Sequence, residues 1–148
     1  MAKKGRHSEP PRTRFQNPLQ PTVLLHFVEL NGFSEDWERL GLDDDDLVKL
    51  QFQLMEGGKH SPIIAGTGGL RKMRFAPDGW RAGKRGAMRV CFCWLERFGI
   101  VLLVTAYAKN EQSDLSARAR RIFRQLLVDA EIELTTRQQN RSRSERKQ

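Results

Sequence analysis

The chain has 148 residues, a length that suits one domain of ordinary size and excludes a large two-domain enzyme. Its two cysteines are too few for a disulfide-rich secreted scaffold, and no apolar run approaches the length of a membrane span. The N-terminus carries basic residues but lacks the apolar segment of a secretory signal, so we expect a cytoplasmic protein without a membrane partner.

The net charge of +8 is concentrated at the two ends of the chain. Residues 1–21 and residues 137–148 each hold five basic residues and one acidic residue, whereas residues 22–136 hold 16 of each sign. Both ends lack apolar periodicity, so neither can bury enough surface to offset the entropy lost on ordering. We therefore expect one domain over residues 22–136 between two disordered basic tails, which would bind polyanions loosely or serve only solubility.

The first part of the predicted domain reads as one strand followed by two helices. Residues 23–30 are apolar and end at an Asn-Gly turn signal, which predicts a strand. Ser34 is a candidate N-cap for a short helix that ends at Gly41. The acidic run Asp43 to Asp46 opens a second helix, whose leucines recur at spacings of three and four residues. Consecutive acidic residues point around a helix and do not converge on one ion, so we expect no metal there.

The second part reads as three strands and a helix. Strands are predicted at residues 70–75, 88–95 and 100–108, and a long basic loop joins the first two. An apolar stripe predicts a helix over residues 114–134. The complete order, β-α-α-β-β-β-α, predicts an α+β fold in which an antiparallel sheet carries its helices on one face.

Side-chain alternation along the strands also predicts a cationic surface. Burial of the apolar strand faces against the helices would leave five polar side chains together on the exposed face: Lys72, Arg74, Arg89, Tyr107 and Lys109. A solvated sheet face with ordinary surface charges is the alternative. Cations on a sheet suit cleavage of RNA without a metal, because the 2′-OH is an internal nucleophile and the cations stabilise the phosphorane.

The two cysteines, Cys91 and Cys93, lie two positions apart on one strand face. Side chains at that spacing are too far apart for a disulfide, and the chain has no second cysteine pair for zinc. We therefore interpret both cysteines as reduced packing residues.

Three stretches, in a fixed order along the chain, carry a resemblance to a known family. They read GTGGLRKMRF (residues 66–75), GAMRVCF (residues 86–92) and LLVTAYAKNE followed by DLS (residues 102–116). Together they resemble the RelE/HigB toxins of type II toxin–antitoxin systems, and most closely the phage-related HigB-like subgroup, over about residues 22–136. The resemblance implies a compact fold like that of microbial ribonucleases. It also implies ribosome-dependent cleavage of mRNA to a 2′,3′-cyclic phosphate and a 5′-OH, with a cognate antitoxin as partner.

The resemblance extends to individual site residues. Lys72 and Arg74 match the basic pair of the family's second strand, and Arg89 matches the arginine that opens its third. Lys109 matches the basic position after the last strand, and Tyr107, the only tyrosine of the chain, stands near it. We predict these five as the catalytic residues, without metal or cofactor. The predicted contacts to RNA or the ribosome are Arg71, Lys84 and Arg85.

Two other functions fit part of the pattern. ParE-type relatives have the same fold but inhibit gyrase and lack the catalytic cations, and a plain RNA-binding module would use the basic surface without cleavage. The density of cations on the predicted second to fourth strands favours the ribonuclease over both alternatives.

Overall fold

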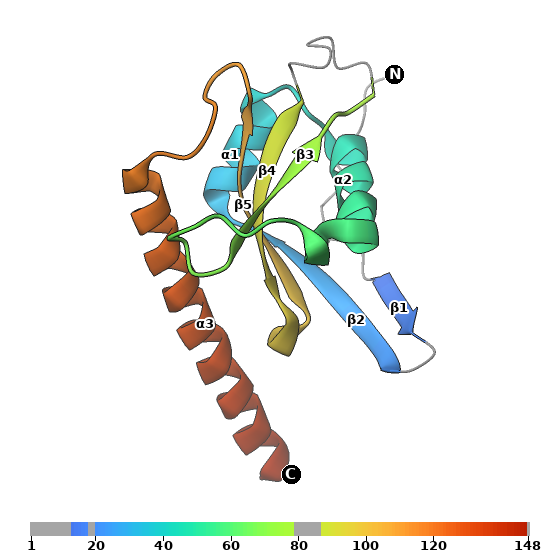
Figure 1. The fold of residues 1–148 in the computed structure, drawn as a ribbon. Helices are drawn as coiled ribbons and strands as arrows, with labels where there is room; N and C mark the ends of the chain where they lie inside the picture. Colours follow the sequence, from blue (N-terminus) through green and yellow to red (C-terminus); the bar gives the residue numbers. More distant parts are fainter. Residues whose placement is uncertain (1–12, 18–19, 79–86, 148) are drawn as a thin grey trace.

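The computed structural model describes residues 13–17, 20–78 and 87–147, with side chains from residue 25 onward. Two short 3-10 turns, Gly58–His60 and Glu96–Phe98, lie between the main elements. The strands and helices, shown in Figure 1, are β1 (Thr13–Asn17), β2 (Gln20–Glu29), α1 (Asn31–Arg39), α2 (Asp44–Gly57), β3 (Leu70–Phe75), β4 (Met88–Leu95), β5 (Ile100–Ala108) and α3 (Ala117–Arg146). The α+β class is confirmed, and the last three strands have the predicted bounds.

The sheet is mixed, with strand order β1-β2-β5-β4-β3, so the prediction of a fully antiparallel sheet is wrong. β3, β4 and β5 form an antiparallel meander, but β2 runs parallel to β5, with His26 opposite Ile100 and Glu29 opposite Leu103. A parallel pair needs a long crossover connection, which here comprises α1, α2 and the two strands β3 and β4. Local periodicity does not reveal the direction of a pairing between strands so distant in sequence.

The edge of β5 beyond its pairing with β2 is covered by α1. Asp36 accepts a hydrogen bond from the backbone N–H of Ala106 at 3.2 Å and another from the hydroxyl of Thr105 at 2.6 Å. These bonds replace the ladder partners that β5 lacks on this side. They therefore satisfy polar groups that an open strand edge would leave unpaired.

α1 and α2 cover one face of the sheet and form the larger core. Trp37 stacks on Phe33 and on Phe75, with ring centroids 5.3 and 5.7 Å apart. Asp43 and Asp46 form a capping box at the start of α2, so the acidic run starts a helix as predicted. The fully or almost fully buried residues of this core include Phe27, Phe33, Leu50, Leu54, Met88, Val90, Phe92 and Val101.

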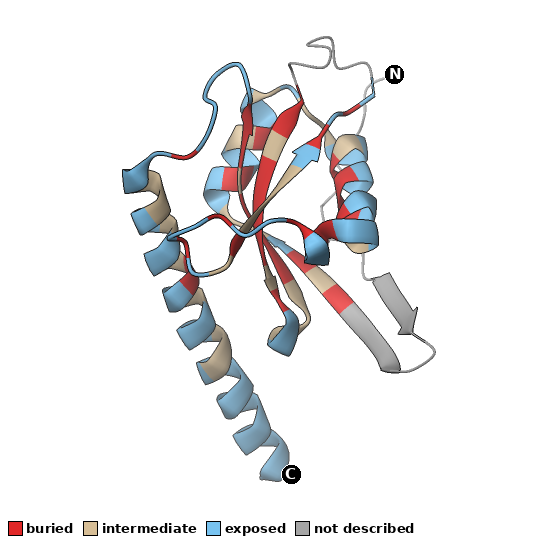
Figure 2. Ribbon diagram, in the orientation of Figure 1, coloured by how far each residue is buried: buried red, intermediate tan, exposed pale blue. Residues whose placement is uncertain are grey.

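α3 covers the opposite face of the sheet, so the prediction of helices on one face only is wrong. Alternate residues of β4 point away from the first core. Three of them, Cys91, Cys93 and Leu95, form a second apolar cluster with α3. Figure 2 shows the buried strands between the helices and the exposed outer side of α3. The stripe of α3 that packs on this cluster comprises Ala119, Phe123, Leu126, Leu127, Ala130 and Leu134.

The structure also differs from the prediction of disordered tails. Residues 13–17 form β1, which pairs with β2, and residues 137–146 continue α3 beyond its last packed residue, Leu134. This end of α3 projects away from the sheet (Figure 1). Its arginine, glutamine and glutamate residues are good helix formers, and an ion pair between Arg137 and Glu133 joins it to the preceding turn.

Candidate functional site

The predicted catalytic side chains form a row across β3, β4 and β5. The register places Arg74 opposite Arg89 and Arg89 opposite Tyr107, and it places Lys72 opposite Cys91 in the next row. Directly opposed residues of neighbouring strands project to the same face of a sheet. One face of the sheet therefore carries Lys72, Arg74, Arg89 and Tyr107. It is the face whose opposite end is covered by α3.

Burial differs sharply along this row. Arg74 is exposed, and Arg89 and Lys72 are half-buried. Tyr107 is only 3 % exposed, so the prediction that its side chain lies open on the surface is wrong.

A β-bulge changes which residues of β5 share the face of Tyr107. The register of β4 and β5 shifts between Cys91 and Phe92, and Val104 of β5 is left without an opposed residue. Leu102 and Val104 consequently join Tyr107 in the apolar cluster beneath α3, instead of sharing the α1–α2 face with the alanines of β5 as alternation predicts. Leu102 thus takes the place that Leu103 would have on this face, and Val104 is one additional apolar residue beside Tyr107 in the cluster.

The Tyr107 hydroxyl has no hydrogen-bond partner within the described part of the structure. Burial is the main cause that raises the pKa of Tyr107 to about 12; the Asp114 carboxylate and, at alkaline pH, the Cys91 thiolate add to the shift, although Arg89 and Arg120 oppose it. The hydroxyl is therefore protonated at neutral pH. It is suited to donate a hydrogen bond or a proton and not to accept one as a phenolate.

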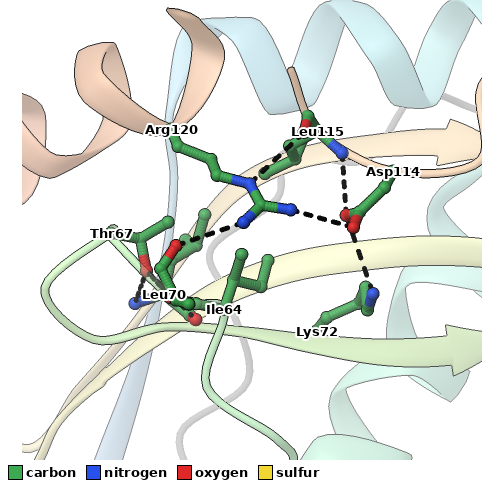
Figure 3. A network of polar contacts seen from close by, with 8 residues as sticks. Ile64, Thr67, Leu70, Lys72, Asp114, Leu115 and Arg120 are labelled. Atoms are coloured by element: carbon green, nitrogen blue, oxygen red, sulfur yellow. Dashed lines mark hydrogen bonds and ion pairs between the residues drawn. The ribbon is translucent and has the colours of Figure 1, made fainter. Parts of the chain in front are cut away.

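Asp114, which was not predicted as a site residue, lies between two of the cations (Figure 3). Its carboxylate accepts hydrogen bonds from the Leu115 backbone N–H at 2.8 Å and from Arg120 Nη2 at 2.9 Å. Lys72 Nζ lies 3.7 Å from the same carboxylate. The Leu115 hydrogen bond is the main cause that holds the pKa of Asp114 below its ordinary value. Burial is the next largest effect and opposes it, and the charges of Lys72 and Arg120 lower the pKa further.

Arg120 is held in place by the loop before β3. Its Nη1 donates to the Ala65 carbonyl at 3.4 Å and its Nε to the Leu115 carbonyl at 3.3 Å (Figure 3). The glycine-rich loop itself is a structural turn, in which the buried Thr67 hydroxyl donates to the Ile64 carbonyl and accepts from the Leu70 N–H. The loop therefore orders Arg120, and we find no phosphate cradle in it.

The remaining predicted residues lie elsewhere. Arg71 alternates with Lys72 along β3 and projects to the other face, where its guanidinium donates to the Ser61 carbonyl at 2.6 Å. Lys109 is exposed in the turn directly after β5. Lys84 and Arg85 lie outside the described residues.

The two cysteines are reduced and buried. Burial is the main cause that raises the pKa of Cys91 to about 12 and that of Cys93 to about 11, so both are thiols at neutral pH and poor nucleophiles. Their placement beneath α3 agrees with a packing role.

Neither a metal site nor a membrane-spanning helix is found in the described part of the chain. Among residues 25–78 and 87–147, no three His, Cys, Asp or Glu side chains gather closely enough to hold a metal ion. Each helix in these ranges is too short or too polar to cross a bilayer.

The arrangement can bind and polarise a phosphodiester. Two guanidiniums on adjacent strands can donate to the oxygens of one phosphate, a lysine adds a third charge, and a protonated phenol lies buried on the neighbouring strand. A search against models of protein families finds no model that matches this sequence.

Proposed function

We propose that the protein is a ribosome-dependent mRNA endoribonuclease, the toxin of a type II toxin–antitoxin system of the RelE/HigB type. The observation that carries this proposal is the row Arg74–Arg89–Tyr107 across three adjacent strands, with Lys72 in the next row. The resemblance of the three sequence stretches supports it. The elements from β2 to α3 follow the expected order after an additional strand, β1, and are compatible with the proposal.

The chemistry follows from the charges on this face. Attack of the 2′-OH on the adjacent phosphorus, with release of its proton to water, gives a phosphorane with additional negative charge on its non-bridging oxygens, which Arg74 and Arg89 would stabilise. The bond to the 5′-oxygen then breaks, and that oxygen takes up a proton, which leaves a 2′,3′-cyclic phosphate and a 5′-OH. Tyr107 is protonated at neutral pH and buried in the free protein, so it would donate that proton or a hydrogen bond once substrate binding uncovers its hydroxyl, and it would regain a proton from water.

Dependence on the ribosome is part of the proposal. Among the described residues, the row Arg74–Arg89–Tyr107 and its neighbour Lys72 supply cations and a phenol but no imidazole, so most of the rate must come from the alignment of the 2′-OH with the phosphorus. A ribosome that holds the codon in place would supply that alignment, and such positioning can contribute several kcal/mol. The ribosome and its mRNA also place the proposed activity in the cytoplasm.

The proposed protein partner is a cognate antitoxin with an acidic segment. Such a segment would cover the cationic face or displace an element from it, since complementary charge speeds association and fixes orientation. A complex in which Lys72, Arg74 and Arg89 remain open to solvent would show that neutralisation works in another way, such as steric exclusion from the ribosome.

The experiment is a translating extract programmed with one defined mRNA, followed by mapping of the new 5′ ends. Cuts at A-site codons that disappear with Arg89→Ala support the nuclease. Arrest of DNA supercoiling by gyrase without RNA cleavage would instead indicate the ParE-type inhibitor. Binding of RNA without cleavage, with or without ribosomes, would indicate a plain RNA-binding module.

A further inference from the structure

Asp114 is surrounded by hydrogen-bond donors from three separate parts of the fold. Lys72 comes from β3, Arg120 from α3, and the Leu115 N–H from the segment between β5 and α3 (Figure 3). Two side-chain cations and one backbone amide are the donor set that a phosphate group binds. The Asp114 carboxylate thus occupies a position at which the protein favours an anion.

The contacts that hold Asp114 there are weak enough to exchange. The side chains of Lys72, Asp114 and Arg120 are 32, 43 and 30 % exposed, and ion pairs this accessible to water contribute little to stability. Lys72 Nζ, 3.7 Å from the carboxylate, is beyond direct hydrogen-bond distance. Arg120, in contrast, is oriented by the Ala65 and Leu115 carbonyls and would keep its direction if Asp114 moved away.

A second observation points to a ligand at this place. The Tyr107 hydroxyl is buried without a partner in the described part of the structure, and it lies close enough to Asp114 and Arg120 for both charges to act on its pKa. Buried hydroxyls are ordinarily paired, so this one calls for a partner that the described residues do not supply, such as a ligand or a water molecule. The register places Tyr107 next to Arg89, which joins this group to the cationic row.

The spacing along β3 fits two successive phosphates. Lys72 and Arg74 are two residues apart on one face of an extended strand, about 7 Å between their Cα atoms. This is close to the separation of neighbouring phosphates in an extended RNA strand. One phosphate can therefore bind at Arg74 and Arg89 while the next lies at Lys72 and Arg120.

We propose that Lys72, Arg120 and the Leu115 amide form a phosphate subsite for the nucleotide next to the scissile bond, and that Asp114 occupies this subsite in the free protein. The inference rests on the proposed action on RNA. Rotation of the Asp114 side chain opens the subsite, and a phosphate takes its place. Asp114 then acts as an internal competitor that lowers the affinity for loose RNA, so that RNA presented in a fixed geometry is favoured.

The test measures the affinity of the full-length protein for a fluorescent 12-nucleotide single-stranded RNA at several salt concentrations. Asp114→Asn removes the competing charge but keeps an acceptor for the Leu115 amide. We expect it to bind about fivefold more tightly, with a salt slope steeper by about one unit. The matched control is Asp129→Asn, an exposed change on α3 about 13 Å along the helix from Arg120, and it should alter the affinity less than twofold.

A double variant isolates the subsite from a general charge effect. In the background of Arg120→Gln, the gain from Asp114→Asn should fall below twofold, because one of the two released cations is gone. Equal gains from Asp114→Asn and Asp129→Asn, or a full gain in the Arg120→Gln background, would overturn the proposal. If circular dichroism shows that Asp114→Asn is unfolded, Asp114→Ser replaces it, since the serine hydroxyl can also accept the amide hydrogen bond.

The outcome is separable from that of the proposed nuclease activity. The same variants are assayed for mRNA cleavage in a translating extract. If Asp114→Asn tightens RNA binding as expected but no protein cuts mRNA, the subsite is supported and the nuclease proposal is wrong. If the unmodified protein cuts mRNA but Asp114→Asn and the unmodified protein bind RNA with equal affinity, the nuclease proposal stands and the subsite proposal is wrong.

Discussion

Replacement of Tyr107 by phenylalanine should stabilise the protein and slow the reaction. The change removes only the hydroxyl of a side chain that is 3 % exposed, and that hydroxyl has no partner in the described part of the structure. A buried polar atom left unpaired costs about 1–3 kcal/mol. Tyr107→Phe should therefore raise the free energy of unfolding by about 1 kcal/mol or more. For a chain of this length, each kcal/mol corresponds to a rise in melting temperature of about 2–4 °C.

The same substitution should reduce mRNA cleavage by about 10²-fold, because the hydroxyl is the proposed donor to the leaving oxygen. Urea unfolding followed by tryptophan fluorescence gives the stability, and 5′-end mapping in a translating extract gives the rate. A stability loss of 1 kcal/mol or more would show that the hydroxyl is paired in solution. An unchanged cleavage rate would refute its role in the chemistry.

Titration of Tyr107 provides an independent check, because it is the only tyrosine of the chain. Burial raises its pKa to about 12, above the ordinary value of 10.0 expected in the unfolded chain. Between pH 10 and 12 the folded protein thus holds a proton that the unfolded chain has lost, so stability should fall as the pH rises through this range. Tyrosinate absorbance should show a midpoint near 12 in the native protein. A midpoint near 10 would contradict the burial of this side chain.

Four further predictions follow from the same structure. Arg74→Ala or Arg89→Ala should abolish cleavage in the translating extract with little loss in the free energy of unfolding in urea. If cleavage and stability are lost together, the arginines are structural. Asp36→Ala should cost about 1–3 kcal/mol in urea unfolding, since it leaves two polar groups at the β5 edge unpaired; no loss would argue against that contact. Leu127→Ala should cost about 2–5 kcal/mol in the same assay, and a smaller effect would show that α3 packs loosely. A chain that ends at residue 136 should fold and cut at the same codons, but its affinity for ribosomes should depend less steeply on salt concentration. A shift of the cleavage sites would show that the removed residues are part of the domain.

The strands were predictable because alternation is a local signal. Residues 70–75, 88–95 and 100–108 were placed at their observed bounds, and period-two alternation predicted that Arg74, Arg89 and Tyr107 share a face. Their direct opposition in one row depends on the strand register, which alternation does not give. The start of α2 was predictable for a similar reason, since the cap and its partner are three residues apart.

The errors concern relations between distant parts of the chain. The parallel pairing of β2 with β5 and the covering of the second sheet face by α3 depend on which apolar surfaces meet in three dimensions. The bulge at Val104 is one unpaired residue, and no composition signal in the strand marks it. It nevertheless adds Val104 to the apolar cluster beneath α3 in which Tyr107 is buried.

Asp114 and Arg120 were missed for a related reason. The two are six residues apart, and α3 begins only at Ala117, so helical spacing does not connect them. Their contact depends on the path of the chain before Ser116 and on the Ala65 carbonyl, which lies in a distant loop. The one available signal was the Asp-Leu-Ser sequence that follows the third stretch of resemblance.

The central claim is that the row of cations on β3 and β4 cuts mRNA on the ribosome. The most direct measurement compares one defined mRNA with and without ribosomes, incubated with the protein or with Arg89→Ala, and maps the 5′ ends and the terminal phosphates. We predict 5′-OH ends at A-site codons that require both the ribosome and Arg89, opposite 2′,3′-cyclic phosphates. Equal cleavage of naked RNA, or cleavage that persists with Arg89→Ala, would contradict the account.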